Sequence, residues 1–207
     1  DCLTSWCYPS GMLTYFEAQL SEAVILPEPA WTGADEAETC AVQWAVAWHF
    51  EGNPVLAESY VNLVPTEQGG THVNGLKAGL CEAIRQFCET HDLLPRGLKL
   101  KPEDVWSKVN YIVSAKVLKP QFLGQTKERL MTKHMTQYVS RVVEDAFSLW
   151  LNQNMQAAEA LAEHLIDIAQ QRLKQAKKIV RKKVVAGPAL PGKLTDCTHS
   201  YDQDSEL

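Results

Sequence analysis

The sequence predicts an α/β domain of the mixed α+β kind, followed by a long C-terminal helix. Residues 40–50 alternate strictly between apolar and small or polar side chains, and residues 110–118 form a β-branched run. Three longer segments, near 73–88, 135–150 and 155–179, instead carry apolar residues at helical spacing. Because these two periods belong to strands and helices respectively, both kinds of element are expected in this 207-residue chain.

The N-terminal part should begin with a short helix over Met12–Ser21 and continue with a loop at Pro27–Pro29 and the acidic residues that follow it. A strand comes next, with one heavy apolar face formed by Val42, Trp44, Val46 and Trp48. Residues 51–54 have turn chemistry and Ser59–Val64 predicts a second strand, so we expect the two strands to form a hairpin.

A helix should follow Gly69–Gly70, with Thr71 as its N-cap and its end near His91. Its apolar stripe consists of Val73, Leu76, Leu80, Ile84, Phe87 and Cys88. Pro102–Trp106 predicts a helical turn and Asn110–Leu118 a further strand, which gives the order β, β, α, β.

Two helices complete the chain. The first carries Met135, Tyr138, Val139, Val142, Ala146, Phe147 and Trp150 and should stop at Asn152–Asn154. The second should run from Met155 to about Lys183, where the sequence has no Gly or Pro, before Gly187–Pro188 ends it. We therefore expect a core over residues 1–154, a connecting helix over 155–186 and a linker over 187–207.

The composition is that of a soluble globular protein, with 45% hydrophobic and 22% charged residues. No run of 18 apolar residues and no secretion signal is present, so we expect a cytoplasmic protein with no membrane partner. The six cysteines form no CxxC pair and are expected to be reduced. A start at Asp1 rather than Met predicts an interior segment of a longer protein.

One segment departs from the net charge of −5. Residues 172–183 hold seven basic residues and no acid, which leaves 13 basic against 25 acidic residues elsewhere. The cations are Arg172, Lys174, Lys177, Lys178, Arg181, Lys182 and Lys183. They predict either a nucleic-acid-facing helix end or a solvated helix face, and the pattern alone does not separate the two.

Other motifs are weaker. Gly187–Leu194 fits GxxxxGK, but Pro188 and Pro191 lack N–H groups for phosphate and Leu194 replaces the magnesium-binding hydroxyl. The six histidines have no metal-ligand spacing, with only His164 and Asp167 one helical turn apart, so no metal site is expected. Three alternating acids near the C-terminus predict an exposed acidic tail: Asp202, Asp204 and Glu206.

The segment Gly124–Lys127 places an amide, a hydroxyl and an ammonium on a glycine-hinged loop. By composition it is a polar loop. The side chains of Gln125, Thr126 and Lys127 would also suit a phosphate sensor, because the ammonium supplies a point charge and the amide a neutral donor.

Four segments in order resemble a known family: QGGTHVNGLKAGL from Gln68, KPQFLGQTKERL from Lys119, WLNQN from Trp150, and AKKIVRKK with GPALPGKLTDC from Ala176. Together they resemble the transducer domain in the B subunit of bacterial topoisomerase IV, a type IIA topoisomerase, with gyrase B as a near relative. The resemblance covers nearly the whole chain, with Thr195 where the family signature has Ala.

This resemblance implies a ribosomal-protein-like domain with a left-handed βαβ crossover. It implies an N-terminal ATPase domain before this segment and a metal-binding TOPRIM domain after it, so the full protein would use ATP and Mg²⁺ and this chain alone would bind neither. By the resemblance, Gln125 and Lys127 contact the ATP γ-phosphate, and this chain holds no catalytic or metal-binding residue.

The implied partners are the topoisomerase IV A subunit, DNA and a second copy of the full-length protein on ATP binding, with nucleoid association inside the cytoplasm. In that setting the chain would couple ATP hydrolysis to DNA strand passage as part of an isomerase. The alternative is a free-standing nucleic-acid-binding module that has only the basic helix in common with the family.

Overall fold

The computed structural model describes residues 7–20, 24–50 and 56–183, with the side chains of 177–183 left out of the description. The chain divides into two compact units, residues 1–170 and 171–207. The first unit contains the sheet and the helices that cover it, and it is described first.

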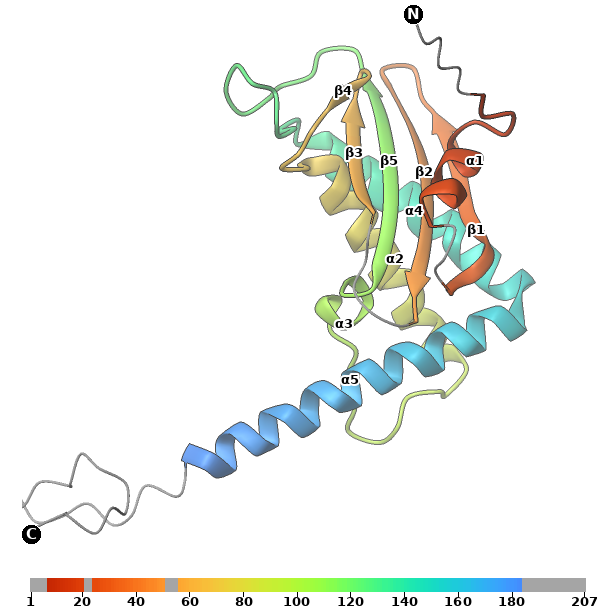
Figure 1. Ribbon diagram of the computed structural model, residues 1–207, viewed down its shortest axis with the longest axis vertical. Helices are drawn as coiled ribbons and strands as arrows, with labels where there is room; N and C mark the ends of the chain where they lie inside the picture. The colour runs from red at the N-terminus through yellow and green to blue at the C-terminus, as the bar shows by residue number, and fades with distance from the viewer. Residues whose placement is uncertain (1–6, 21–23, 51–55, 184–207) are drawn as a thin grey trace, which may run out of the picture. The chain divides into compact units, whose positions relative to one another are not determined.

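A five-stranded mixed sheet forms the centre of the first unit (Figure 1). Its strands are β1 (Ile25–Glu36), β2 (Cys40–His49), β3 (Ala57–Val61), β4 (Val64–Pro65) and β5 (Val109–Val117), in the spatial order β1-β2-β5-β3-β4. The β3–β5 pair is parallel and all other pairs are antiparallel. The predicted α/β class is therefore confirmed at the level of a mixed sheet with helices.

The predicted hairpin between the strands at 40–50 and 59–64 is wrong. β5 lies between β2 and β3, and β2 pairs with β5 from Cys40–Val117 to Trp48–Val109. Turn residues between two strands favour a hairpin, but the β-branched run of β5 has both faces buried and fits the centre of the sheet. The segment predicted as one strand is instead β3 and β4, joined by a turn at Asn62–Leu63.

The predicted loop at Pro27–Pro29 is also wrong, because β1 runs through it. Proline cannot donate a ladder hydrogen bond and is confined to edge strands or irregular positions. β1 meets both conditions: it is at the edge of the sheet, and its register with β2 shifts between Leu26 and Trp31.

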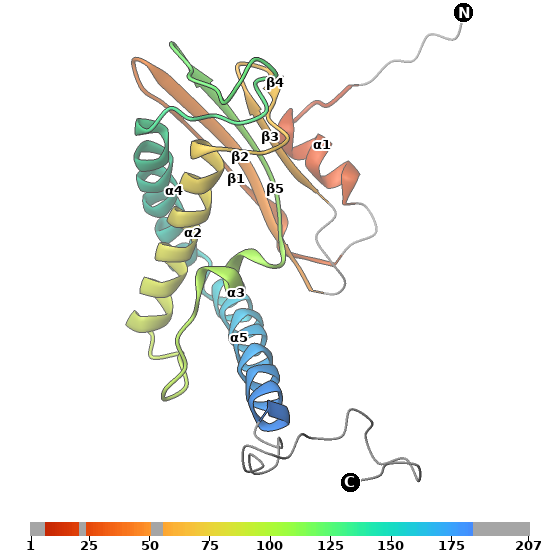
Figure 2. The ribbon, with the colours of Figure 1, turned by 90° about the vertical axis from the view of Figure 1, so that its left-hand side faces the viewer.

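Two helices, α2 (Thr71–Thr90) and α4 (His134–Gln153), cover one face of the sheet (Figure 2). The predicted stripe of α2 is buried except for Val73, which is partly buried. On the sheet, the heavy face of β2 packs into the same core, with Trp44 and Trp48 both under 2% exposed. Thr71 is not the N-cap: Gly70 takes that position, no side chain caps the helix, and the buried Thr71 hydroxyl finds no hydrogen-bond partner among the described residues.

The helices α2 and α4 approach closely because α2 has glycine where their backbones meet. A Cβ on Gly75 would lie 2.7 Å from the carbonyl oxygen of Thr136, and one on Gly79 would lie 2.5 Å from that of Ser140. Only a residue without a side chain fits at these distances, so the two glycines set the spacing of the helical layer.

The opposite face of the sheet carries the predicted N-terminal helix, α1 (Met12–Gln19) (Figure 2). Phe16 is fully buried there with Ala45, Ala47 and Ile112. The small residues of β2 therefore make room for α1, while the large ones face α2 and α4.

The short helix α3 (Pro102–Trp106) precedes β5, and α5 (Met155–Lys183) is the predicted long helix. Within the first unit, α5 buries Ala158, Leu161 and Leu165 in the main core. In the second unit, the structure describes α5 as continuous to Lys183. The four described cysteines, Cys7, Cys40, Cys81 and Cys88, are free thiols, as predicted.

Candidate functional site

The predicted Gln125–Lys127 site lies at the tip of a long connection between β5 and α4. Gln125, Thr126 and Lys127 are all exposed. Within the described residues, neither Gln125 nor Lys127 forms an ion pair or side-chain hydrogen bond. The amide and the ammonium are therefore both available to a ligand.

The backbone of this tip is held in unusual conformations. Gly124 has φ 72° and Lys127 has φ 57°. Glycine enters this region freely, but a residue with a Cβ does so at a cost, and such residues concentrate at functional sites. The conformation turns the chain back sharply, so the N–H of Leu123 reaches the carbonyl of Arg129 at 2.9 Å.

The base of the loop is fixed to the start of α2, in contrast to its tip. Leu130 is fully buried, its N–H donates to the carbonyl of Gly69 at 3.1 Å, and its carbonyl accepts from Thr71 at 3.0 Å. A further hydrogen bond joins the N–H of Gln68 to the carbonyl of Glu128 at 3.0 Å. The structure thus brings together two of the segments that the family resemblance rested on, QGGTH and FLGQTKERL.

Gly70 makes this junction possible. Its φ of 138° is one that L side chains rarely adopt, and a Cβ would lie 2.4 Å from the Leu130 carbonyl oxygen. A displacement of the loop base would therefore act directly on the backbone at the first turn of α2.

A buried polar cluster lies beside this first turn, and the sequence did not predict it. The Thr66 hydroxyl lies 2.7 Å from the Ser59 hydroxyl and 3.4 Å from Nε2 of His72, while Nδ1 of His72 has no partner in the described part of the chain. Burial lowers the pKa of His72 to about 4, so the imidazole is neutral at pH 7. One sequence signal could have indicated this cluster: a His directly after a predicted helix start, with a Thr six residues before it.

The predicted DNA-facing cations belong to α5 beyond residue 170. Arg172 is half-buried and Lys174 is exposed. The other five are on the helical backbone, with side chains outside the described set: Lys177, Lys178, Arg181, Lys182 and Lys183. Continuous helix through Lys183 puts all seven cations on consecutive turns.

Metal chemistry has no candidate centre in the part of the chain that the structure describes. No group of three His, Cys, Asp or Glu side chains there could hold an ion. His164 is partly buried, its ring packs on Phe50 at 4.7 Å between centroids, and burial lowers its pKa. The GxxxxGK segment at 187–194 and the acidic tail at 202–206 lie outside the described residues.

Across the same described ranges, no helix combines the length and the apolar character that crossing a membrane requires.

Comparison with known proteins gives a family-model match over residues 11–180, described as DNA gyrase B. The chain is 56% identical over 202 residues to the B subunit of DNA topoisomerase 4 from Salmonella typhimurium and 55% identical to that from Escherichia coli. Each alignment covers 98% of this chain and 32% of the relative, so the chain spans about a third of the length of the curated relatives it matches.

Two solved structures from topoisomerase IV and gyrase B are also similar to this chain. The topoisomerase IV ATP-binding domain of Francisella tularensis, in complex with a small-molecule inhibitor, superposes with a TM-score of 0.70 at 32% identity, covering 81% of this chain and 45% of that one. The 43K ATPase domain of Thermus thermophilus gyrase B, in complex with an aminocoumarin, has a TM-score of 0.74 at 23% identity, covering 84% and 46%. At 23% identity, the similarity to the gyrase B domain shows a shared fold alone.

Proposed function

The chain belongs to the DNA gyrase B family, and on that premise we propose that it is the transducer segment of an ATP-dependent type IIA topoisomerase. In this proposal the exposed tip Gly124–Lys127 senses the terminal phosphate of ATP, and the segment couples hydrolysis to DNA strand passage. The observation that carries the proposal is a cation without an ion-pair partner among the described residues, at the tip of a loop whose base is hydrogen-bonded to a packed helix.

The residues of the loop suit one anionic group rather than a whole nucleotide. Lys127 offers a charge-assisted hydrogen bond, worth about 1.5 to 3 kcal/mol, and Gln125 a neutral one. ATP, bound mainly by other parts of the longer protein, would supply the anionic phosphate. Mg²⁺ would be held outside the described residues, which contain no cluster of ligands for it.

Lys127 would stabilise negative charge that shifts during hydrolysis, and its contact would be lost when the phosphate leaves. The connection inward is short: Leu130 lies three residues from Lys127 and is bonded to Gly69 and Thr71 at the start of α2. The tip would therefore have two positions, one with the phosphate bound and one after it leaves, and each would favour a different position of α2 relative to the loop.

The decisive experiment is steady-state ATPase turnover of a full-length topoisomerase IV B subunit carrying this segment, with its A subunit and DNA. Lys127→Ala should lower kcat about 100- to 1000-fold, because a positioned cation at the reacting group contributes that much. Lys119→Ala is the matched control, since Lys119 is an exposed lysine of the same connection. A wild-type rate in Lys127→Ala would refute the sensor role.

The basic end of α5 would face DNA. Binding should be independent of sequence and fall steeply with salt, at a slope of about −3.6 in log K against log salt if about four cations meet phosphates. Reversing Lys178, Arg181 and Lys182 to Glu should abolish it. The control triple reversal, at Lys116, Lys119 and Lys133, changes the net charge equally on the first unit and should preserve most of the binding.

These tests also separate the transducer from a free-standing nucleic-acid-binding module. A module would lose DNA binding in the α5 triple variant but show no ATPase effect at Lys127. A transducer would show both. The further partners in this proposal are the A subunit, a second copy of the full-length protein, and ATPase and TOPRIM domains on either side, in the bacterial cytoplasm at the nucleoid.

A further inference from the structure

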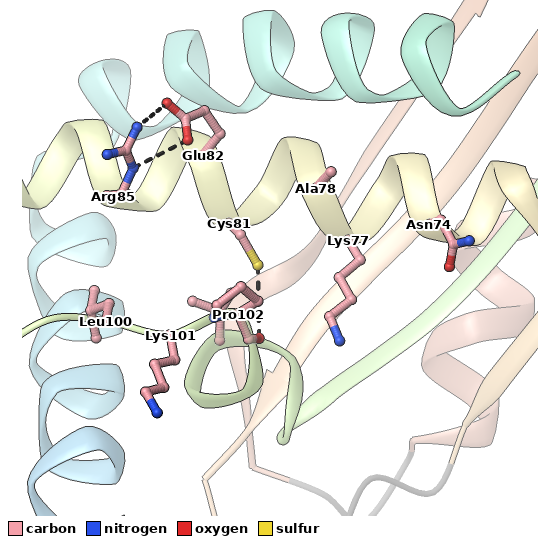
Figure 3. Close-up of a pocket in the computed structure, with 10 residues that line it drawn as sticks. Asn74, Lys77, Ala78, Cys81, Glu82, Arg85, Leu100, Lys101 and Pro102 are labelled. Atoms are coloured by element: carbon pink, nitrogen blue, oxygen red, sulfur yellow. Dashed lines mark hydrogen bonds and ion pairs between the residues drawn. The ribbon is translucent and has the colours of Figure 1, made fainter. Parts of the chain in front are cut away.

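A cavity of about 410 Å³ opens on the first unit, between α2 and the segment that leads into α3 (Figure 3). It lies away from the loop tip and away from the basic end of α5 in sequence, and the proposed function uses none of its residues. Its volume falls within the range of small-molecule sites, about 300 to 1000 Å³.

Four apolar residues line the cavity: Ala78, Leu100, Pro102 and Val105. Val105 is buried and Leu100 half-buried, whereas Ala78 and Pro102 are exposed. Val105 is 2% exposed, and its carbonyl accepts a hydrogen bond of 2.9 Å from the indole of Trp48, which fixes α3 to the sheet. A ligand would therefore meet a surface that is already ordered.

The start of α3 is fixed as well. The backbone N–H of Lys101 donates to a carboxylate oxygen of Asp104 at 2.9 Å, and the Cys81 thiol donates to the carbonyl of Pro102 at 3.8 Å. The second contact ties the two walls of the cavity together (Figure 3).

The lining carries three cations, Lys77, Lys101 and Arg85, and one carboxylate, Glu82. Lys77 and Lys101 extend on either side of Pro102 (Figure 3), and neither forms an ion pair with a described residue. The Lys77 ammonium lies over the ring of Trp106, 5.8 Å from the ring centroid. The third cation, Arg85, is neutralised by Glu82 and Glu89.

We infer that this cavity binds a small amphipathic monoanion, an aryl or alkyl carboxylate or sulfonate, with its apolar body on Leu100, Pro102 and Val105 and its anionic group between Lys77 and Lys101. A simple inorganic anion would leave the apolar wall uncovered, and a neutral apolar molecule would leave both ammonium groups unused. This site is independent of the proposed function.

Cys81 provides a reporter inside the cavity, because its thiol is one of the lining groups. Burial raises its pKa to about 11, so its reaction with N-ethylmaleimide at neutral pH is slow and is followed over hours. Cys7 is exposed and free, and serves as an internal reference in the same chain.

The experiment measures alkylation rates of Cys81 and Cys7 by peptide mass spectrometry with naphthalene-2-sulfonate as the probe. Saturating probe should slow Cys81 at least fivefold and leave Cys7 unchanged, while inorganic sulfate at the same concentration should protect neither. No protection of Cys81, equal protection of Cys7, or equal protection by sulfate would each overturn the inference.

Variants then test the two halves of the site. Lys77→Met with Lys101→Met keeps the aliphatic stems, removes both charges and should weaken the probe at least tenfold. Lys119→Met with Lys133→Met, at two exposed lysines elsewhere, should have no effect. Ala78→Trp should fill the cavity and abolish protection with both charges still present; an equal loss in the control pair, or full protection in Ala78→Trp, would refute the site.

Discussion

The α2–α4 contact and the connection that carries the Gly124–Lys127 tip meet at the first turn of α2. The two regions are nevertheless organised in opposite ways. Thr71 links them: its N–H donates to Leu130 of the loop base, and its carbonyl accepts from the hydroxyl of Thr136 on α4 at 3.1 Å. At Gly75 and Gly79 in the helical layer, the backbones approach so closely that no Cβ fits. At the tip, Gln125 and Lys127 make no side-chain hydrogen bond or ion pair with a described residue.

This contrast shows how an exposed polar tip is positioned. The body is fixed by steric fit, and the exposed tip is placed by the few hydrogen bonds of its base. Side chains in the body should therefore affect stability and leave the tip chemistry alone, whereas tip residues should affect turnover and leave stability alone.

The largest expected difference comes from one substitution made in both regions. Gly79→Ala should destabilise the chain by about 3 kcal/mol, because its Cβ would overlap the Ser140 carbonyl on α4. Gly124→Ala should cost about 1 kcal/mol, since its surroundings are open and only the φ of 72° opposes it. Urea unfolding of the two variants measures both values, and equal losses would remove the distinction between the regions.

A pH titration sharpens the same comparison at the junction. Burial lowers the pKa of His72 from 6.5 to about 4 on folding, so the unfolded chain binds this proton at higher pH. The stability from neutral His72 is complete above about pH 6.5 and is lost as the pH falls toward 4. Between pH 7.5 and pH 5 the loss should be about 2 kcal/mol.

Unfolding free energies of His72→Gln should show this loss greatly reduced, with a smaller remainder of the same sign from His164, whose pKa burial also lowers. His91→Gln, at an exposed histidine, is the matched control for the substitution itself. An unchanged slope in His72→Gln would mean that the imidazole is not held neutral by the fold.

The smallest expected effect is that of the second tip residue. Gln125→Ala should lower kcat of the full-length protein about tenfold, less than Lys127→Ala, because the amide has no charge to lose. Its unfolding free energy should equal that of the wild type, since the exposed Gln125 amide forms no hydrogen bond with a described residue. A larger loss at Gln125 than at Lys127 would reverse the proposed roles of amide and ammonium.

Local patterns determined much of this protein. The alternation of Val42, Trp44, Val46 and Trp48 predicted the strand and its heavy face, and the Gly-free, Pro-free run after Met155 predicted the long helix. The polar tip at Gln125 and Lys127 was also identifiable from its residues. Each of these features depends on periods or side chains within one segment of the chain.

Only the tertiary structure decided the rest, because it depends on partners distant in sequence. Strand order is such a property: β5 separates β2 from β3 although the turn between them favoured a hairpin, and β1 tolerates Pro27 and Pro29 because it lies at the sheet edge. The attachment of the tip to the start of α2 is a second property that depends on distant partners. Gly70 reads as a turn residue in the sequence, and only the approach of Leu130, sixty residues later, makes it the point where the loop meets α2.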